Sequence, residues 1–174
     1  HDPAAALPPL AQVRLALSAG ATFVQYRNKR FQAAHLAEAR AIAALCRVNG
    51  VPLVVNDDLR LALALEADGV HLGQTDTPPA LARELLGDGA VIGVSVSDLR
   101  ELARPDLAPC DYVGTGPTFA TTTKADAKPV RGLAGLREMA ARVTLPLVAI
   151  GGVTPENAGS CLAAGADGVA VISA

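Results

Sequence analysis

The 174-residue sequence predicts an α/β fold, a (β/α)8 TIM barrel. Short apolar runs alternate with stretches of helical composition, and this alternation is typical of a parallel sheet. A polar cluster follows most of the apolar runs, where a barrel collects its active-site residues. Seven βα units fit a barrel that lacks its first strand and last helix. We therefore expect one barrel domain over residues 1–174 that is incomplete at both ends, with a further strand before His1 and a further helix after Ala174.

The strands are predicted from β-branched residues and from bounding Gly or Pro. They are Phe23–Tyr26, Leu53–Asn56, Val70–Leu72, Val91–Val94, Tyr112–Gly114, Leu147–Ile150 and Val169–Ile172. The helices are predicted from runs of Ala, Leu, Arg and Glu. They are Gln32–Val48, Leu59–Ala67, Pro79–Leu86, Leu99–Arg104, Leu133–Arg142 and Pro155–Ala164.

Local signals support several of these boundaries. Thr77 and Thr154 each precede a proline, which is typical of an N-cap followed by Pro at the first helical position, and Asp98 with Glu101 fits a capping box. The leucines of Leu59–Ala67 repeat every second residue, as in a strand. We still predict a helix there, because a strand would lack the connection that a parallel pair requires.

Composition excludes several classes of protein. The chain has 15 basic and 17 acidic residues, a net charge of -2 and no basic run, so neither nucleic acid nor an anionic membrane is an expected partner. Three well-separated cysteines argue against a disulfide framework and a zinc site and indicate a reducing compartment, the cytoplasm. No stretch is apolar enough to span a membrane. Small molecules are the expected partners, and a homo-oligomer stays open.

The first polar cluster contains Gln25, Arg27 and Lys29, which alternate with Val24 and Tyr26. Residues two apart on a strand share a face, so an amide and two cations should converge at the carboxyl end of this strand. Two cations suit a phosphate or pyrophosphate, since Arg binds in a bidentate manner and Lys as a point charge. The alternative is ordinary surface charge on an exposed strand end.

Carboxylates follow the next two strands. Asp57 comes after Asn56 at the end of one run, and Asp76 follows the next. One or two carboxylates with substrate phosphate oxygens are a common Mg²⁺ site. The alternative is that Asp57 or Asp58 caps the following helix and that Asp76 is a turn residue. We interpret His71 as a core or pocket-wall residue.

A second phosphate site is indicated further along the chain. Gly114, Gly116, Thr121, Thr123 and Lys124 form a long polar stretch after a strand, where backbone amides, hydroxyls and one cation could bind phosphate oxygens. Gly151, Gly152 and Ser173 lie at the ends of the last two strands, the usual barrel location for phosphate. A flexible polar loop and a simple tight turn are the alternatives.

The chain resembles the thiamine phosphate synthase family, also called thiamine phosphate pyrophosphorylase. The matching positions run in order along nearly the whole chain: Gln25, Arg27, Lys29, Asn56, Asp57, Gly69 to Gln74, Asp76, Gly93, Ser95, Asp111, Tyr112, Gly114, Gly116, Pro117, Thr121, Thr123, Lys124, Gly151, Gly152 and Ile172 to Ala174. The resemblance implies a barrel that joins an aminopyrimidine methyl pyrophosphate to a thiazole ethyl phosphate. It also implies a requirement for Mg²⁺ and a dissociative mechanism, in which pyrophosphate departs before the thiazole nitrogen attacks.

The resemblance also implies a role for each matching residue. Gln25 contacts the pyrimidine, and Asp57 and Asp76 bind Mg²⁺. The pyrophosphate contacts are Arg27, Lys29, Asn56, Lys124 and Ser95. The thiazole phosphate contacts are Thr121, Thr123, Gly152 and Ser173, with Ile172 beside them in the substrate site. The residues expected to act in catalysis are Arg27, Lys29, Ser95 and Lys124.

The sequence departs from the family at Asn28, where an acid is common. Two rival functions remain: a thiazole tautomerase, which shares the barrel but not the pyrophosphate chemistry, and a non-catalytic barrel that binds a phosphorylated ligand. The carboxylates and cations favour the synthase. Release of pyrophosphate would separate the three.

Overall fold

The structure is a computed structural model that describes residues 7–103, 106–121 and 128–172. The internal contacts of the chain divide it into two compact units. Unit 1 contains His1–His71 and Leu81–Val91, and unit 2 contains Leu72–Ala80 and Ile92–Ala174. The prediction of a single domain stays a prediction.

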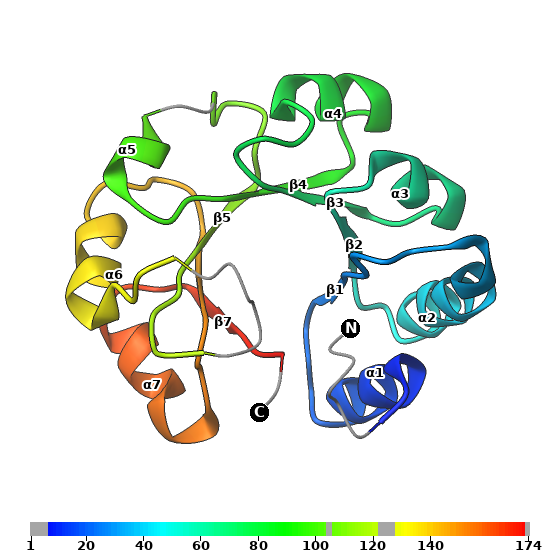
Figure 1. Cartoon of the computed structure of the whole chain (residues 1–174), viewed down its shortest axis with the longest axis horizontal. Helices are drawn as coiled ribbons and strands as arrows, with labels where there is room; N and C mark the ends of the chain where they lie inside the picture. Colours follow the sequence, from blue (N-terminus) through cyan, green and yellow to red (C-terminus); the bar gives the residue numbers. More distant parts are fainter. Residues whose placement is uncertain (1–6, 104–105, 122–127, 173–174) are drawn as a thin grey trace. The chain divides into compact units, whose positions relative to one another are not determined.

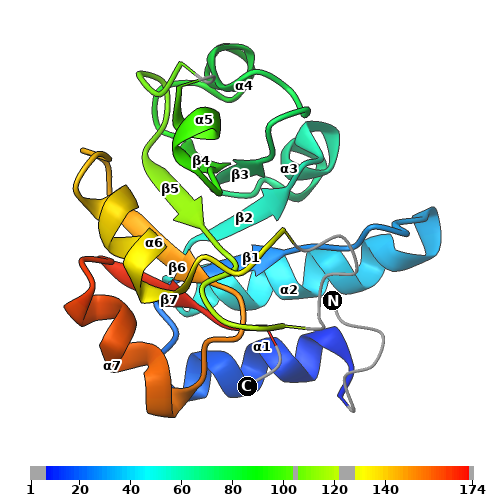
Figure 2. The same cartoon turned by 60° about the vertical axis from the view of Figure 1, so that its left-hand side comes forward.

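Unit 1 is a parallel βα array. Its elements are α1 (Pro9–Ser18), β1 (Val24–Tyr26), the short 3-10 helix η1 (Ala33–His35), α2 (Leu36–Val48), β2 (Leu53–Asn56), α3 (Leu59–Leu65) and β3 (Gly69–Leu72), whose last residue belongs to unit 2. The three strands are parallel and pair in chain order, Tyr26 with Val55 and Asn56 with His71. Helices α1 and α2 lie side by side (Figures 1 and 2).

Unit 2 repeats this plan. Its elements are β4 (Val91–Ser95), whose first residue belongs to unit 1, α5 (Leu99–Leu102), β5 (Tyr112–Thr115), α6 (Gly132–Ala140), β6 (Leu147–Ile150), α7 (Pro155–Ala163) and β7 (Gly168–Ala170). Helix α4 (Pro79–Leu86) has residues in both units. The strands again pair in parallel and in chain order. In the part of the chain that the structure describes, seven parallel strands alternate with helices, which confirms the predicted α/β class and the βα order of the TIM-barrel fold.

The strands form the core because parallel strands are covered on both faces and read as continuous apolar runs. In β2, Leu53, Val54 and Val55 are each at most 1% exposed. The leucine-rich stretch after β2 is a helix, as predicted, with Leu61 and Leu65 buried and Leu63 exposed. The alternation of leucines therefore reflects a short helix with apolar residues on more than one face.

Three aspartates hold the entrances of the strands. Asp68 accepts a hydrogen bond from the Leu53 N–H at 2.7 Å, and it precedes β3. Asp111, before β5, accepts from the Ile92 N–H at 2.7 Å, and Asp167, before β7, accepts from the Leu147 N–H at 2.8 Å. Each bond joins a strand entrance to the strand before it. The aspartate before each of these strands, which stands in an Ala-Asp-Gly sequence at positions 68 and 167, thus ties the strand to its neighbour.

Several element boundaries differ from the prediction. Helix α1 was not predicted, although Pro9 at its first turn and an Ala- and Leu-rich composition indicate a helix. Helix α4 has the predicted bounds, but Pro78, expected at the first helical position after a Thr77 cap, lies outside the helix, because a residue before proline disfavours helical angles. Strand β7 ends at Ala170, two residues early. Thr154 caps α7 and Asp98 caps α5, as predicted.

Candidate active site at the carboxyl ends of the strands

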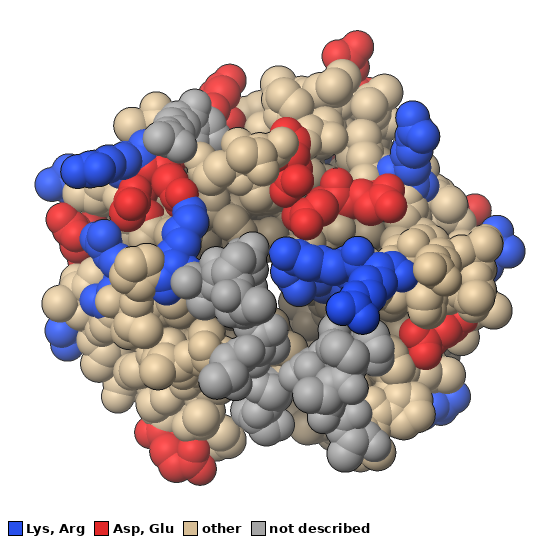
Figure 3. Space-filling view, viewed as in Figure 1, with Lys and Arg blue, Asp and Glu red and all other residues tan. Residues whose placement is uncertain are grey.

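The cationic cluster follows β1. Val24 and Tyr26 are buried and Gln25 is exposed, which confirms the predicted alternation. Arg27 is half-buried and Lys29 is exposed in the turn that follows. Because Tyr26 pairs with Val55, Arg27 stands at the level of Asn56 on β2. Figure 3 shows Lys and Arg side chains gathered over the end of β1.

Asn28 shapes the turn that carries these cations. Its side-chain Oδ1 accepts a hydrogen bond from the Arg30 N–H at 2.9 Å, and its carbonyl accepts from the Phe31 N–H at 3.3 Å. An aspartate could accept the same bond from Arg30, because both side chains form turns of this kind. The departure from the family at this position is therefore structurally mild.

An aromatic group anchors the turn to the start of α2. The ring of Tyr26 meets that of Phe31 edge-on, with the ring centroids 6.4 Å apart. The ring centroids of Phe31 and His35 are 5.9 Å apart. Burial raises the pKa of the Tyr26 phenol, although the nearby Asn28 side chain opposes the shift. No group meets hydrogen-bond geometry to the buried Tyr26 Oη among the described atoms. The neutral phenol therefore acts as packing beneath the cationic turn.

At the end of β2, two neighbouring aspartates have different surroundings. Asp58 caps α3, because its Oδ1 accepts a hydrogen bond from the Leu61 N–H at 2.9 Å. Asp57 has a positive φ of 63°, an uncommon conformation for a residue with a side chain, and its N–H donates to the His71 carbonyl at 2.9 Å. The helix cap thus belongs to Asp58, and the capping alternative does not explain Asp57. His71 is 7% exposed and agrees with the predicted wall position.

Asp76 lies in a tight turn after β3. Its Oδ2 accepts a hydrogen bond from the Gly73 N–H at 2.7 Å, and its own N–H donates to the Gly73 carbonyl at 3.4 Å. A Cβ at position 73 would lie 2.7 Å from the same Oδ2, so a larger residue there would displace the Asp76 carboxylate. The carboxylate therefore holds its own loop closed, which agrees with the turn alternative without excluding a ligand at the second oxygen.

The loops after β5 and β6 are joined. The N–H groups of Thr118 and Phe119 donate to the carbonyls of Ile150 and Gly151, each at 2.9 Å. Gly152 has a φ of +62°, and a Cβ there would lie 2.3 Å from the Ala120 carbonyl oxygen. The pair Gly151-Gly152 is therefore more than a simple turn, because it lets the segment that leads into Thr121 lie directly against β6.

The structure describes only some of the remaining predicted site residues. Thr121 is half-buried. Ile150, the last residue of β6, pairs with Ala170, the last residue of β7, and Ile172, which follows β7, is 47% exposed. Thr123, Lys124 and Ser173 lie outside the described residues. Ser95 is the half-buried last residue of β4.

One supporting residue was not predicted. Asn157 Nδ2 donates to the Gly152 carbonyl at 3.0 Å, and its Oδ1 accepts from the Thr154 N–H at 2.9 Å. The signal in the sequence is the capping box at the start of α7, which here contains Asn in place of Glu or Gln. This side chain thus holds both the helix N-terminus and Gly152.

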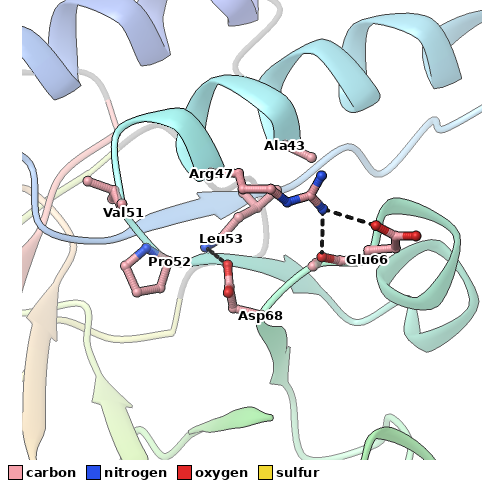
Figure 4. Close-up of a pocket in the computed structure, with 9 residues that line it drawn as sticks. Ala43, Arg47, Val51, Pro52, Leu53, Glu66 and Asp68 are labelled. Atoms are coloured by element: carbon pink, nitrogen blue, oxygen red, sulfur yellow. Dashed lines mark hydrogen bonds and ion pairs between the residues drawn. The ribbon is translucent and has the colours of Figure 1, made fainter. Parts of the chain in front are cut away.

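A cavity of about 210 Å³ lies at the other end of β2 (Figure 4). It is lined by Ala43, Arg47, Gly50, Val51, Pro52, Leu53, Glu66, Ala67 and Asp68. Arg47 Nη2 lies 3.4 Å from the Glu66 carbonyl oxygen and 3.3 Å from its Oε2, and so ties the ends of α2 and α3. None of the predicted site residues lines this cavity. In TIM-barrel enzymes the active site lies at the opposite, carboxyl face of the barrel. We therefore assign the residues around this cavity a role in the stability of the fold.

Two negative findings apply to residues 7–103, 106–121 and 128–172. No group of three or more His, Cys, Asp or Glu side chains gathers to form a metal site there. No helix in these ranges has the length and apolar composition to cross a membrane.

Comparison with known proteins agrees with the predicted family. Residues 4–174 match the family described as thiamine monophosphate synthase. A thiamine-phosphate synthase of Moorella thermoacetica is 49% identical over 168 residues, covering 96% of this chain and 80% of the relative. One of Laribacter hongkongensis is 52% identical over 161 residues, covering 91% and 75%.

Solved structures agree. A thiamine phosphate pyrophosphorylase from Pyrococcus furiosus superposes with a TM-score of 0.82 at 38% identity, covering 95% of this chain and 79% of that one. A phosphoribosyl anthranilate isomerase from Thermotoga maritima reaches a TM-score of 0.64 at 18% identity, which shows likeness of fold alone, over 94% of this chain and 82% of that one. The chain belongs to the thiamine monophosphate synthase family.

Proposed function

We propose that the carboxyl ends of the strands carry out the family's reaction, the joining of a pyrimidine methyl pyrophosphate to a thiazole ethyl phosphate. The bond between the pyrimidine methylene carbon and the pyrophosphate oxygen breaks, and its electron pair leaves with pyrophosphate. The thiazole nitrogen then donates its lone pair to the resulting cation and forms the new C–N bond. No proton is transferred in these steps, so the site needs no general base.

The observation that carries this proposal is the backbone of Asp57. Its neighbour Asp58 caps α3, whereas Asp57 is held in a left-handed conformation by the His71 carbonyl. Such a conformation costs about 1–2 kcal/mol and tends to occur where a side chain is needed in a particular place. We infer that the place is a ligand site. This supports a role in catalysis over a purely structural one.

Asp57 and Asp76 are the proposed ligands of Mg²⁺. Carboxylates are suitable ligands for this ion, which usually takes one or two of them and completes its shell with water and substrate phosphate oxygens. Asp57 lies at the end of β2, and one Asp76 oxygen is already used by Gly73 N–H. Bound there, Mg²⁺ would supply positive charge to the pyrophosphate. The comparisons are consistent with a metal-dependent enzyme without identifying the metal.

The chain's own cations have a related task. Departing pyrophosphate gathers negative charge, so Arg27, Lys29 and Lys124 would stabilise the transition state more than the bound substrate. Asn56 and Ser95 are proposed to contact the same group, and Gln25 the pyrimidine. Thr121, Thr123, Gly152, Ile172 and Ser173 are proposed for the thiazole phosphate. The joined loops after β5 and β6 support this last assignment, since they bring Gly152 against the segment that leads to Thr121.

The compartment is a further part of the proposal. Cys46, Cys110 and Cys161 are buried free thiols. Free cysteines without disulfides favour a reducing, cytoplasmic setting.

The test is pyrophosphate release by the whole chain with both substrates and Mg²⁺. We expect release that depends on both substrates and on the metal. A tautomerase would change the thiazole carboxylate phosphate without releasing pyrophosphate, and a non-catalytic barrel would bind without turnover. Absence of release by protein that binds both substrates would reject the proposed function.

A further inference from the structure

The turn that carries Asp76 is bonded to the end of the neighbouring strand in unit 2. Gln74, two residues before Asp76, points its amide at β4, where Nε2 donates a hydrogen bond to the Ser95 carbonyl at 2.8 Å. The bond is partly buried and joins residues 21 positions apart in the chain. It is therefore a tertiary contact and not a feature of the local turn.

Both ends of this contact are well defined. On one side, Gly73 and Asp76 close the turn through the Gly73 N–H and the Asp76 carboxylate. On the other, Ser95 pairs with Gly114 in the β4–β5 ladder, and the Val96 N–H donates to the Gly114 carbonyl at 2.9 Å. The Gln74 amide thus connects a closed turn to a strand end that the sheet holds in place.

We propose that Gln74 is a positioning residue that holds the Asp76 carboxylate in register with Ser95. This inference rests on the proposed function, which gives Asp76 to Mg²⁺ and Ser95 to pyrophosphate. The two groups must meet one substrate at the same time, and a misplacement of about 1 Å in such a site can cost about 10²-fold in rate. Outer contacts that orient metal ligands typically change metal affinity or activity by about 10-fold to 100-fold.

The chemistry of the contact requires the amide of glutamine. Methionine has a similar length but no donor, and its substitution would leave the partly buried Ser95 carbonyl without this partner. Glutamate would place a carboxylate against a carbonyl oxygen, where both groups are acceptors. Asparagine keeps the donor but shortens the side chain by one methylene.

The test compares Gln74→Met and Gln74→Asn with a matched control. Gln12 Nε2 on α1 also donates to a backbone carbonyl, that of Leu7 at 2.6 Å, and we assign Gln12 no role in the site. Gln12→Met therefore removes a hydrogen bond from a glutamine amide to a backbone carbonyl at an exposed position elsewhere in the chain. Each variant is measured for thermal unfolding, for steady-state kinetics over a range of Mg²⁺ and by calorimetric titration with Mg²⁺ and pyrophosphate.

For both Gln74 variants we expect binding of Mg²⁺ with pyrophosphate to weaken by roughly 10-fold, with a parallel rise in the Mg²⁺ concentration for half-maximal activity. The KM for the thiazole phosphate should stay within about twofold. Gln12→Met should change neither quantity. Because calorimetry does not depend on turnover, the binding result stands by itself.

Two outcomes separate this inference from the proposed function. If the unaltered chain releases pyrophosphate and both Gln74 variants bind and respond to Mg²⁺ as it does, the positioning role is wrong while the function stands. If the Gln74 variants lower the melting temperature but leave Mg²⁺ binding and the Mg²⁺ response unchanged, the contact is structural and the inference is again wrong. Absence of activity in the unaltered chain would instead reject the function.

Discussion

The two aspartates after β2 allow a sharp test, because Asp58 caps α3 and the neighbouring Asp57 is proposed to bind Mg²⁺. Asp58→Ala removes the hydrogen bond that Asp58 Oδ1 accepts from the Leu61 N–H at 2.9 Å. Loss of an N-cap of this kind costs about 1 kcal/mol, which corresponds to a fall in melting temperature of about 2–4 °C for a chain of this size. We expect turnover and Mg²⁺ dependence to be unchanged, since the cap contacts no substrate in the proposed site.

Asp57→Asn should instead lower turnover and leave the stability of the fold nearly unchanged. Asparagine tolerates the left-handed conformation seen at this position, so the free energy of unfolding should change by less than about 0.5 kcal/mol. The substitution removes the charge proposed to bind Mg²⁺. Loss of several kcal/mol of charge stabilisation predicts that turnover falls roughly 10²-fold or more.

The assays are thermal unfolding by circular dichroism and the initial rate of pyrophosphate release over a range of Mg²⁺. The two variants serve as controls for each other, because they alter adjacent residues of the same type. If Asp58→Ala abolishes turnover without loss of stability, or if Asp57→Asn keeps full turnover, the division of tasks at the end of β2 is refuted.

Three further predictions concern unit 2. Gly152→Ala should lower the free energy of unfolding by at least about 1 kcal/mol, because it forces alanine to a φ of +62° and a Cβ to within 2.3 Å of the Ala120 carbonyl oxygen; denaturant unfolding measures this. Lys124→Ala should lower turnover at saturating substrate by roughly 10²-fold to 10³-fold, the scale for one preorganised electrostatic contact. Burial raises the pKa of Glu101, but its hydrogen bond and ion pair with Lys128 and the bond from the Ser97 N–H outweigh burial and lower that pKa. A lowered folded pKa gives stability that is complete above the ordinary pKa of about 4.3 and is lost as pH falls through the folded value. The difference in free energy of unfolding between the unaltered chain and Glu101→Gln should therefore shrink as pH falls below about 4.3.

Each of these predictions has a clear opposing result. An unchanged free energy of unfolding for Gly152→Ala would mean that the loop after β5 moves away without cost. Unchanged turnover for Lys124→Ala would reject its role in pyrophosphate departure. A stability gap for Glu101→Gln that widens as pH falls would contradict the direction of the Glu101 pKa shift.

Much of the fold could be predicted from the sequence. The bounds of β2 and β6 agree with the prediction, and Thr154 and Asp98 cap the helices expected of them. These features follow from local chemistry, namely β-branched runs and side chains that bond backbone groups within three residues. The end of β7 was less predictable, since strand length depends on pairing with a neighbour.

The sequence by itself determined the order of βα units, the polar cluster at each strand end and the type of chemistry that those clusters support, because periodicity and side-chain type are local properties. Only the structure showed that Asp58 caps α3 and that the Asp57 N–H donates to the His71 carbonyl on the next strand. It also identified the contact of Gln74 with Ser95, which residues 21 positions apart make only after the chain has folded. Sequence patterns indicate which groups reach an edge of the sheet, but the hydrogen bonds that join neighbouring strands form only in the folded chain.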